Sequence, residues 1–117
     1  MKQVVFLVQS APHGTAAIPE SQRSCLGLAT MPFEIRYVLE ADAVWALLPG
    51  QSPEAIGSSD ARELVTQLAD LDVALYVEKE ALAVRGMAAA DLGPEFTTVT
   101  REHIAEFIAS ADAVLTY

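Results

Sequence analysis

Short apolar, β-branched runs alternate with helical patterns along this chain, and that alternation constrains the fold most. Val4 to Val8 is an uninterrupted apolar run, typical of a strand that helices bury on both faces. Similar runs predict four more strands, at residues 35–39, 73–77, 96–99 and 113–117. The expected fold class is therefore α/β, a three-layer α/β/α domain with a mainly parallel five-stranded sheet and right-handed crossovers.

Helix signals fill the intervals between the predicted strands. Pro19 suits the first position of a helix that runs through Cys25. Ser59 and Asp60 are the N-cap candidates of another helix, with Glu63 at capping-box spacing from Asp60, and Thr100 predicts the start of a third. The remaining segments are expected to be a buried apolar segment at 41–48, a loop at 49–59 and a short helix at 79–85.

The composition favours one compact domain over residues 1–117, because 52% of the residues are hydrophobic and only 20% are charged. A net charge of -9 repels phosphate backbones, so no direct nucleic-acid partner is expected. The longest apolar run has six residues, far fewer than the ~20 that span a bilayer; we expect no membrane segment and a cytoplasmic location. Cys25 is the single cysteine, which excludes an internal disulfide and a cysteine-based zinc cluster.

Ligands of open parallel sheets bind beyond the carboxyl ends of the strands, and three polar loops of this sequence are expected there. They carry His13 and Gly14, then Glu40 and Asp42, then Glu78 and Glu80. Gly14 lacks the companion glycines of a dinucleotide fingerprint and the Lys and Ser/Thr of a phosphate loop, so we expect no cofactor. For the carboxylates a solvated face is favoured over a metal site. For His13 a structural or exposed role is favoured over a general base.

Cys25 and Trp45 each allow two interpretations. A thiolate is a strong nucleophile where its pKa is depressed, but Cys25 lies inside a predicted helix beside Leu26, where packing as a small hydrophobe is favoured. Cys25 is the one catalytic candidate, and no catalytic residue is assigned. Trp45 lies in the apolar run 43–48. It belongs either to the core or to a subunit interface, where tryptophan is enriched.

Several strings of residues resemble those of one protein family. They are the loop Ser10–Thr15, the central string of residues 41–51, Leu82 with Arg85 and Gly86, and the terminal residues 112–115. Together they resemble the DsrE/DsrF/DsrH superfamily of sulfur-relay proteins, and within it the TusC/DsrF branch. The likeness extends over nearly the whole chain, and the central string is its most specific part.

The resemblance implies a DsrE/DsrF-like domain in a cytoplasmic heterohexamer, in which TusB-, TusC- and TusD-like chains share one fold. Sulfur would pass as a persulfide through a cysteine of the TusD-like chain toward 2-thiouridine at the wobble position of tRNA. That cysteine follows the third strand in sulfur-carrying sister chains, where this chain has Val77, Glu78, Lys79 and Glu80. A carboxylate cannot form a persulfide, so the resemblance implies a non-catalytic structural subunit. Candidate pocket or interface residues are His13, Gly14, Asp42, Trp45 and Glu78.

Three alternatives stay open from the sequence. One is a sulfurtransferase that uses Cys25. Another is a stand-alone homo-oligomer that binds a small ligand near His13 and Asp42. The third is a subunit of a DsrE–DsrF–DsrH complex that serves dissimilatory sulfur oxidation. They differ in the partners of the chain and in whether Cys25 carries sulfur, so copurification and persulfide labelling separate them.

Overall fold

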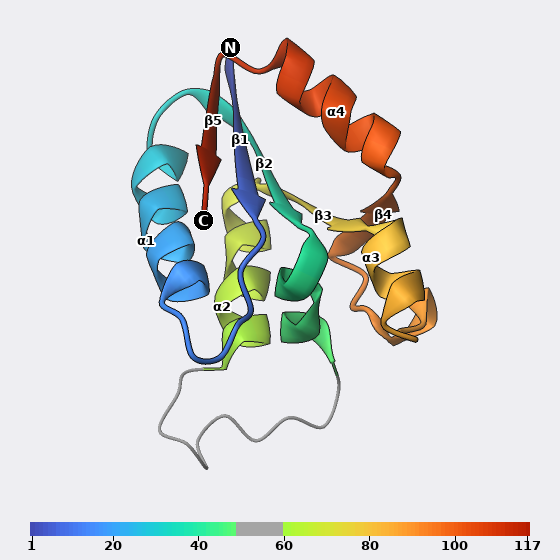
Figure 1. Cartoon of the computed structure of the whole chain (residues 1–117). Coiled ribbons are helices and arrows are strands. Elements are labelled where there is room, and N and C mark those ends of the chain that lie inside the picture. Colours follow the sequence, from blue (N-terminus) through green and yellow to red (C-terminus); the bar gives the residue numbers. More distant parts are fainter. Residues whose placement is uncertain (49–59) are drawn as a thin grey trace.

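Five parallel strands form the single sheet seen in the computed structural model, which describes residues 1–48 and 60–117. The strands are β1 (Lys2–Val8), β2 (Phe33–Leu39), β3 (Ala74–Glu78), β4 (Phe96–Val99) and β5 (Ala113–Thr116). Their order across the sheet is β4-β3-β2-β1-β5 (Figure 1). Because every neighbouring pair is parallel, all carboxyl ends lie at one edge of the sheet. The predicted α/β fold class is confirmed.

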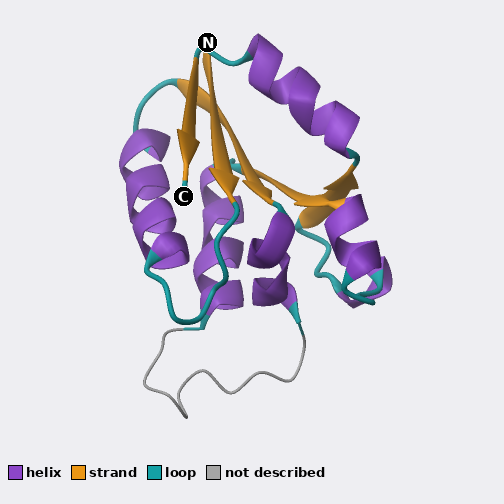
Figure 2. Cartoon of the chain, in the orientation of Figure 1, coloured by secondary structure: helices purple, strands orange, loops and turns teal. Residues whose placement is uncertain are grey.

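The helical elements cross between consecutive strands and cover both faces of the sheet (Figure 2). The α-helices are α1 (Ala17–Ala29), α2 (Ala61–Thr66), α3 (Lys79–Val84) and α4 (Arg101–Ser110), and the 3-10 helices are η1 (Ala41–Leu47), η3 (Gln67–Leu71) and η4 (Ala89–Asp91). None of these helices, in the part of the chain that is described, is long and apolar enough to cross a bilayer.

Alternate side chains of β1 enter two separate cores. Phe6 and Val8 pack on one face with residues of α1, η1 and α2 in the larger core. Val5 and Leu7 pack on the other face, where α4 contributes Ile104. Among the described helices, α4 alone supplies buried side chains to this second core. The two faces of the sheet are therefore unequally covered, and α4 is essential to the smaller core.

The predicted helix starts are partly confirmed. The side chain of Asp60 accepts a hydrogen bond from the backbone N–H of Glu63, and Thr100 caps α4 in the same way. The prediction for Pro19 is wrong by two residues, because α1 begins at Ala17. Proline is tolerated there since the first four N–H groups of a helix have no intrahelical acceptor. The loop expected at 49–59 lies outside the described residues.

The apolar segment after β2 forms η1, and most of it is buried as expected. Ala43, Val44, Ala46 and Leu47 are at most 1% exposed, whereas Trp45 is half-buried. The segment thus contributes one side to the larger core and keeps its tryptophan near the surface.

We predict that Ile104→Ala lowers the free energy of unfolding by about 3 kcal/mol, because it leaves a cavity in the core that α4 covers. Denaturant unfolding followed by circular dichroism measures this cost. The control is Ile108→Ala, one turn later on α4, where the side chain is 40% exposed; it is expected to cost under about 1 kcal/mol. Equal costs for the two variants would contradict the packing described for α4.

Candidate functional site at the carboxyl ends of β2 and β3

A cavity of about 420 Å³ lies where the carboxyl ends of β2 and β3 meet α4. It is lined by Glu40, Ala41, Glu78, Arg85, Arg101, Ile104, Ala105 and Ile108. Charged groups come from the ends of the strands, from the residue after α3 and from the first residue of α4, and apolar side chains come from later residues of α4. This is the edge of a parallel sheet at which ligand sites form.

Glu78, the last residue of β3, is the buried charge of the cavity and is 5% exposed. Its Oε1 accepts a hydrogen bond from the backbone N–H of Ala41 at 3.1 Å. Its Oε2 accepts a second from Nε of Arg101 at 2.7 Å, which is also an ion pair. A buried carboxylate is tolerated when it is paired and hydrogen-bonded in this way. Both oxygens of Glu78 therefore have donors.

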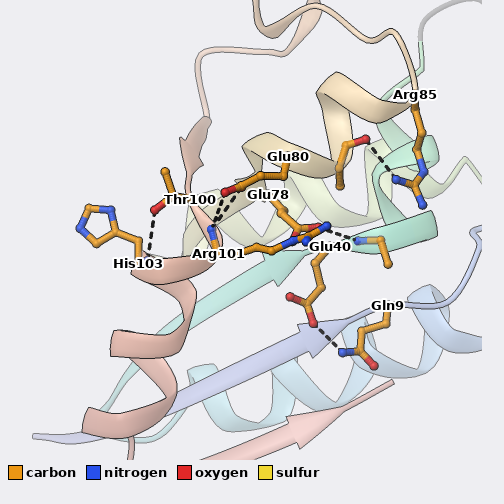
Figure 3. Close-up of polar contacts among 10 residues, drawn as sticks. Gln9, Glu40, Glu78, Glu80, Arg85, Thr100, Arg101 and His103 are labelled. Atoms are coloured by element: carbon orange, nitrogen blue, oxygen red, sulfur yellow. Dashed lines mark hydrogen bonds and ion pairs between the residues drawn. The ribbon is translucent and has the colours of Figure 1, made fainter.

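Arg101 joins Glu78 to Glu80 at the amino terminus of α4 (Figure 3). The backbone N–H of Arg101 donates to the two carboxylate oxygens of Glu80, at 3.1 and 3.2 Å. Hydrogen bonds from its own backbone N–H and from that of Arg101 lower the pKa of Glu80. The hydrogen bond and charge of Glu78 raise the pKa of Arg101. Arg101 is thus bonded to both carboxylates at this end of the sheet.

Arg85 forms a second bridge over the same edge. Its Nη2 donates to Oδ1 of Asp42 at 2.8 Å, and its Nη1 donates to the carbonyl of Ala81 at 3.1 Å. The side chain of Asp42 is 61% exposed, so this pair lies at the rim of the site. The bridge ties the end of α3 to the start of η1.

Glu40 is held by the residue that follows β1. Nε2 of Gln9, which directly follows β1, donates to Oε1 of Glu40 at 2.5 Å (Figure 3). The loops after β1, β2 and β3 thus meet at one edge.

In residues 1–48 and 60–117, no group of three or more His, Cys, Asp or Glu side chains is arranged to hold a metal ion.

The structure brings together some of the residues selected from the sequence and separates others. Asp42 and Glu78 lie at the same edge and are bonded to Arg85 and Arg101 respectively. Half-buried His13 and exposed Gly14 are in the loop after β1 and do not line this cavity. Gly14 has a φ of +82°, a conformation that glycine adopts readily.

Cys25 lies away from the cavity, on the face of α1 that packs into the larger core. It is 0% exposed. Burial raises the pKa of its thiol to about 12. In this environment the thiol is protonated at neutral pH and closed to solvent, whereas a reactive cysteine needs an accessible thiolate.

Sequence reasoning missed Arg101 as a site residue. A helix N-terminal position usually favours acidic side chains, so an arginine directly after the capping Thr100 was the available signal. Its pairing with Glu78, a residue 23 positions earlier, depends on the β3–β4 connection and could not be read from local patterns.

Comparison with known proteins identifies the family. Residues 2–117 match the model of the DsrE/DsrF-like family. The chain belongs to this family. The predicted resemblance to it is confirmed, because the match covers almost the entire chain.

The family members most informative for this chain include proteins named TusC. A TusC homolog of Vibrio parahaemolyticus is 32% identical over 118 residues and covers 100% of both chains. TusC of Escherichia coli strain K12 is 38% identical over 60 residues, which are 51% of this chain and 50% of that protein. The crystal structure of the ychN protein of E. coli has a TM-score of 0.87 and 26% identity, with 100% of both chains covered. The expected TusC/DsrF branch is supported by both sequence relatives.

We predict that Arg101→Met lowers the free energy of unfolding more than Arg85→Met does, because it removes the cation that is paired with the buried Glu78 carboxylate. The matched control is Arg85→Met, which breaks the pair with the exposed Asp42 and should cost under about 1 kcal/mol. Urea unfolding of both variants at pH 7 measures the difference. Equal losses would show that the Glu78 ion pair contributes no more to the free energy of unfolding than the exposed pair of Arg85 and Asp42.

We predict that the native Cys25 thiol resists modification by a disulfide reagent at pH 8. Raising its pKa from 9.0 to about 12 lowers the thiolate fraction at that pH by about a thousandfold. Absorbance measured with and without urea gives the two rates, and the unfolded chain is the control. Comparable rates in the two states would contradict the burial of Cys25.

Proposed function

We propose that this chain is a non-catalytic structural subunit of a cytoplasmic sulfur-relay complex of the TusB–TusC–TusD type. It would support persulfide transfer between other subunits during synthesis of 2-thiouridine at the wobble position of tRNA. Membership of the DsrE/DsrF-like family and the TusC names of its relatives support this proposal.

The observation that carries the proposal is the bonding of Glu78 at the end of β3. The family resemblance leads us to expect a sulfur-carrying cysteine of sister chains just after this strand. Glu78, the last residue of β3, is buried next to that position. Ala41 and Arg101 are the donors to its two oxygens. A carboxylate cannot form a persulfide, and its negative charge would raise the pKa of a nearby thiol. This edge is therefore better suited to holding the fold together than to carrying sulfur.

Cys25 gives little support to the alternative of a sulfurtransferase. Its thiol is buried among the apolar residues of the larger core and has a raised pKa. Persulfide transfer requires contact between the attacking sulfur and a donor protein, which a fully buried side chain cannot make without local unfolding. The sulfur cargo would thus remain on partner chains.

The segment around Trp45 is the proposed contact surface for those partners. Trp45 is half-buried, and Leu48, three residues later, is 38% exposed. Tryptophan is enriched at the centres of interfaces, where it contributes much of the binding energy. Stable hetero-oligomers bury more than ~2,000 Å², so further surface beyond η1 must take part.

We predict that the chain assembles stably when coexpressed with TusB-like and TusD-like chains of the same cell. Light scattering coupled to size exclusion measures the mass of the product. A heterohexamer that contains all three chains is the expected result. A monomer that ignores both partners would refute the proposal, and a homo-oligomer with a retained small ligand would favour the stand-alone alternative.

The same complex separates the remaining alternatives. With Cys25→Ser, transfer of labelled sulfur to tRNA should proceed at the unchanged rate, and mass spectrometry should find no added sulfur on the wild-type Cys25. A sulfane adduct on Cys25 together with loss of transfer in the variant would establish the sulfurtransferase. Loss of sulfur oxidation rather than of tRNA 2-thiouridine in a deletion strain would assign the chain to the DsrE–DsrF–DsrH type.

A further inference from the structure

The start of η1 is held by an unusual combination of a strained residue and long-range contacts. Ala41 has a φ of 51°, in the left-handed region that a non-glycine residue enters only at a steric cost. Glu40, its N-cap residue, makes no side-chain capping hydrogen bond in the described part of the chain, and its Oε1 instead accepts from Gln9. Locally, the Ala43 N–H donates to the Glu40 carbonyl at 3.1 Å, and contacts with distant residues add to this turn bond.

Two groups from the β3–α3 unit hold the first two residues of η1. The Glu78 carboxylate accepts the backbone N–H of Ala41 at 3.1 Å. The Arg85 guanidinium donates to the Asp42 carboxylate at 2.8 Å. The other oxygen of Glu78 accepts from Arg101, so the carboxylate is held from both sides. These contacts determine where η1 leaves the sheet.

The orientation of η1 determines how Trp45 is presented. Four of the seven residues of η1 are buried against the larger core, and Trp45, one turn after Asp42, is half-buried between them. A 3-10 helix has three residues per turn, so a rotation at residues 41–42 would change the exposure of Trp45 together with that of its buried neighbours.

We propose that Glu78 and Arg85 are positioning residues that hold η1 in the orientation in which Trp45 contacts a sister subunit. The contact with a subunit rests on the proposed function, whereas the positioning of Trp45 is a property of the isolated chain. Glu78 would then orient the η1 surface that contacts the sister subunit, and it would not carry sulfur itself.

The test uses Trp45 as its own reporter, because it is the single tryptophan of the chain. Acrylamide quenching and the emission maximum are measured on the isolated full chain. Glu78→Ala should raise the quenching constant and shift the emission to longer wavelength, since the Ala41 N–H loses its acceptor. Glu78→Gln should lie closer to the wild-type values than Glu78→Ala does, because its amide oxygen can still accept from Ala41 although its NH2 group cannot accept from Arg101.

The matched control is Glu80→Gln, which changes a neighbouring carboxylate bonded to Arg101 but not to η1. It should leave the emission of Trp45 unchanged. Arg85→Met provides an independent test that does not disturb a buried charge, and it should also raise the quenching constant. Wild-type quenching in Arg85→Met, or in a folded Glu78→Ala, would overturn the proposal. So would an equal increase in Glu80→Gln.

Binding to the partner chains tests the second half of the inference. The affinity of Glu78→Ala for the TusB-like and TusD-like chains should fall by at least about tenfold, and Glu78→Gln should retain it. Increased quenching with unchanged affinity would refute the role of Trp45 in docking. Failure of the wild-type chain to bind either partner would refute the proposed function, and the quenching results would still decide the positioning of η1.

Discussion

The burial of β1 on both faces is the constraint on which the rest of the structure depends. Val5, Phe6 and Val8 are all 0% exposed, although consecutive side chains of a strand point to opposite faces. Helices must therefore lie on both sides of the sheet, and crossover connections make its strands parallel. Parallel strands end at one edge, so the loops that follow β1, β2 and β3 converge without any local signal that directs them together.

The charges at that edge form a bonded network. The carboxylates of Glu40, Glu78, Glu80 and Asp42 accept hydrogen bonds from Gln9, Ala41, Arg101 and Arg85. A chain with a net charge of -9 would repel itself where acids gather. The two arginines reduce this repulsion, and their hydrogen bonds connect β3, α3, η1 and α4.

Local patterns in the sequence were sufficient for most of the fold and for part of the site. The run Val4 to Val8 predicts β1, and Asp60 and Thr100 predict two helix starts, because each signal acts within a few residues. The start of α1 was misplaced since proline is accepted throughout a first helical turn. The Arg101–Glu78 pair joins distant segments, so it requires knowledge of the tertiary arrangement.

The left-handed conformation of Ala41 makes two distant positions depend on each other. A cysteine in place of Glu78 would have a thiol, which is a weak hydrogen-bond acceptor. The Ala41 N–H, 37 residues earlier, would then lose its strong acceptor. Glycine at position 41 would relieve the steric cost, since it enters this region freely. Substitutions at the two positions are therefore coupled, because the acceptor at position 78 helps to hold a non-glycine residue in the turn that follows β2.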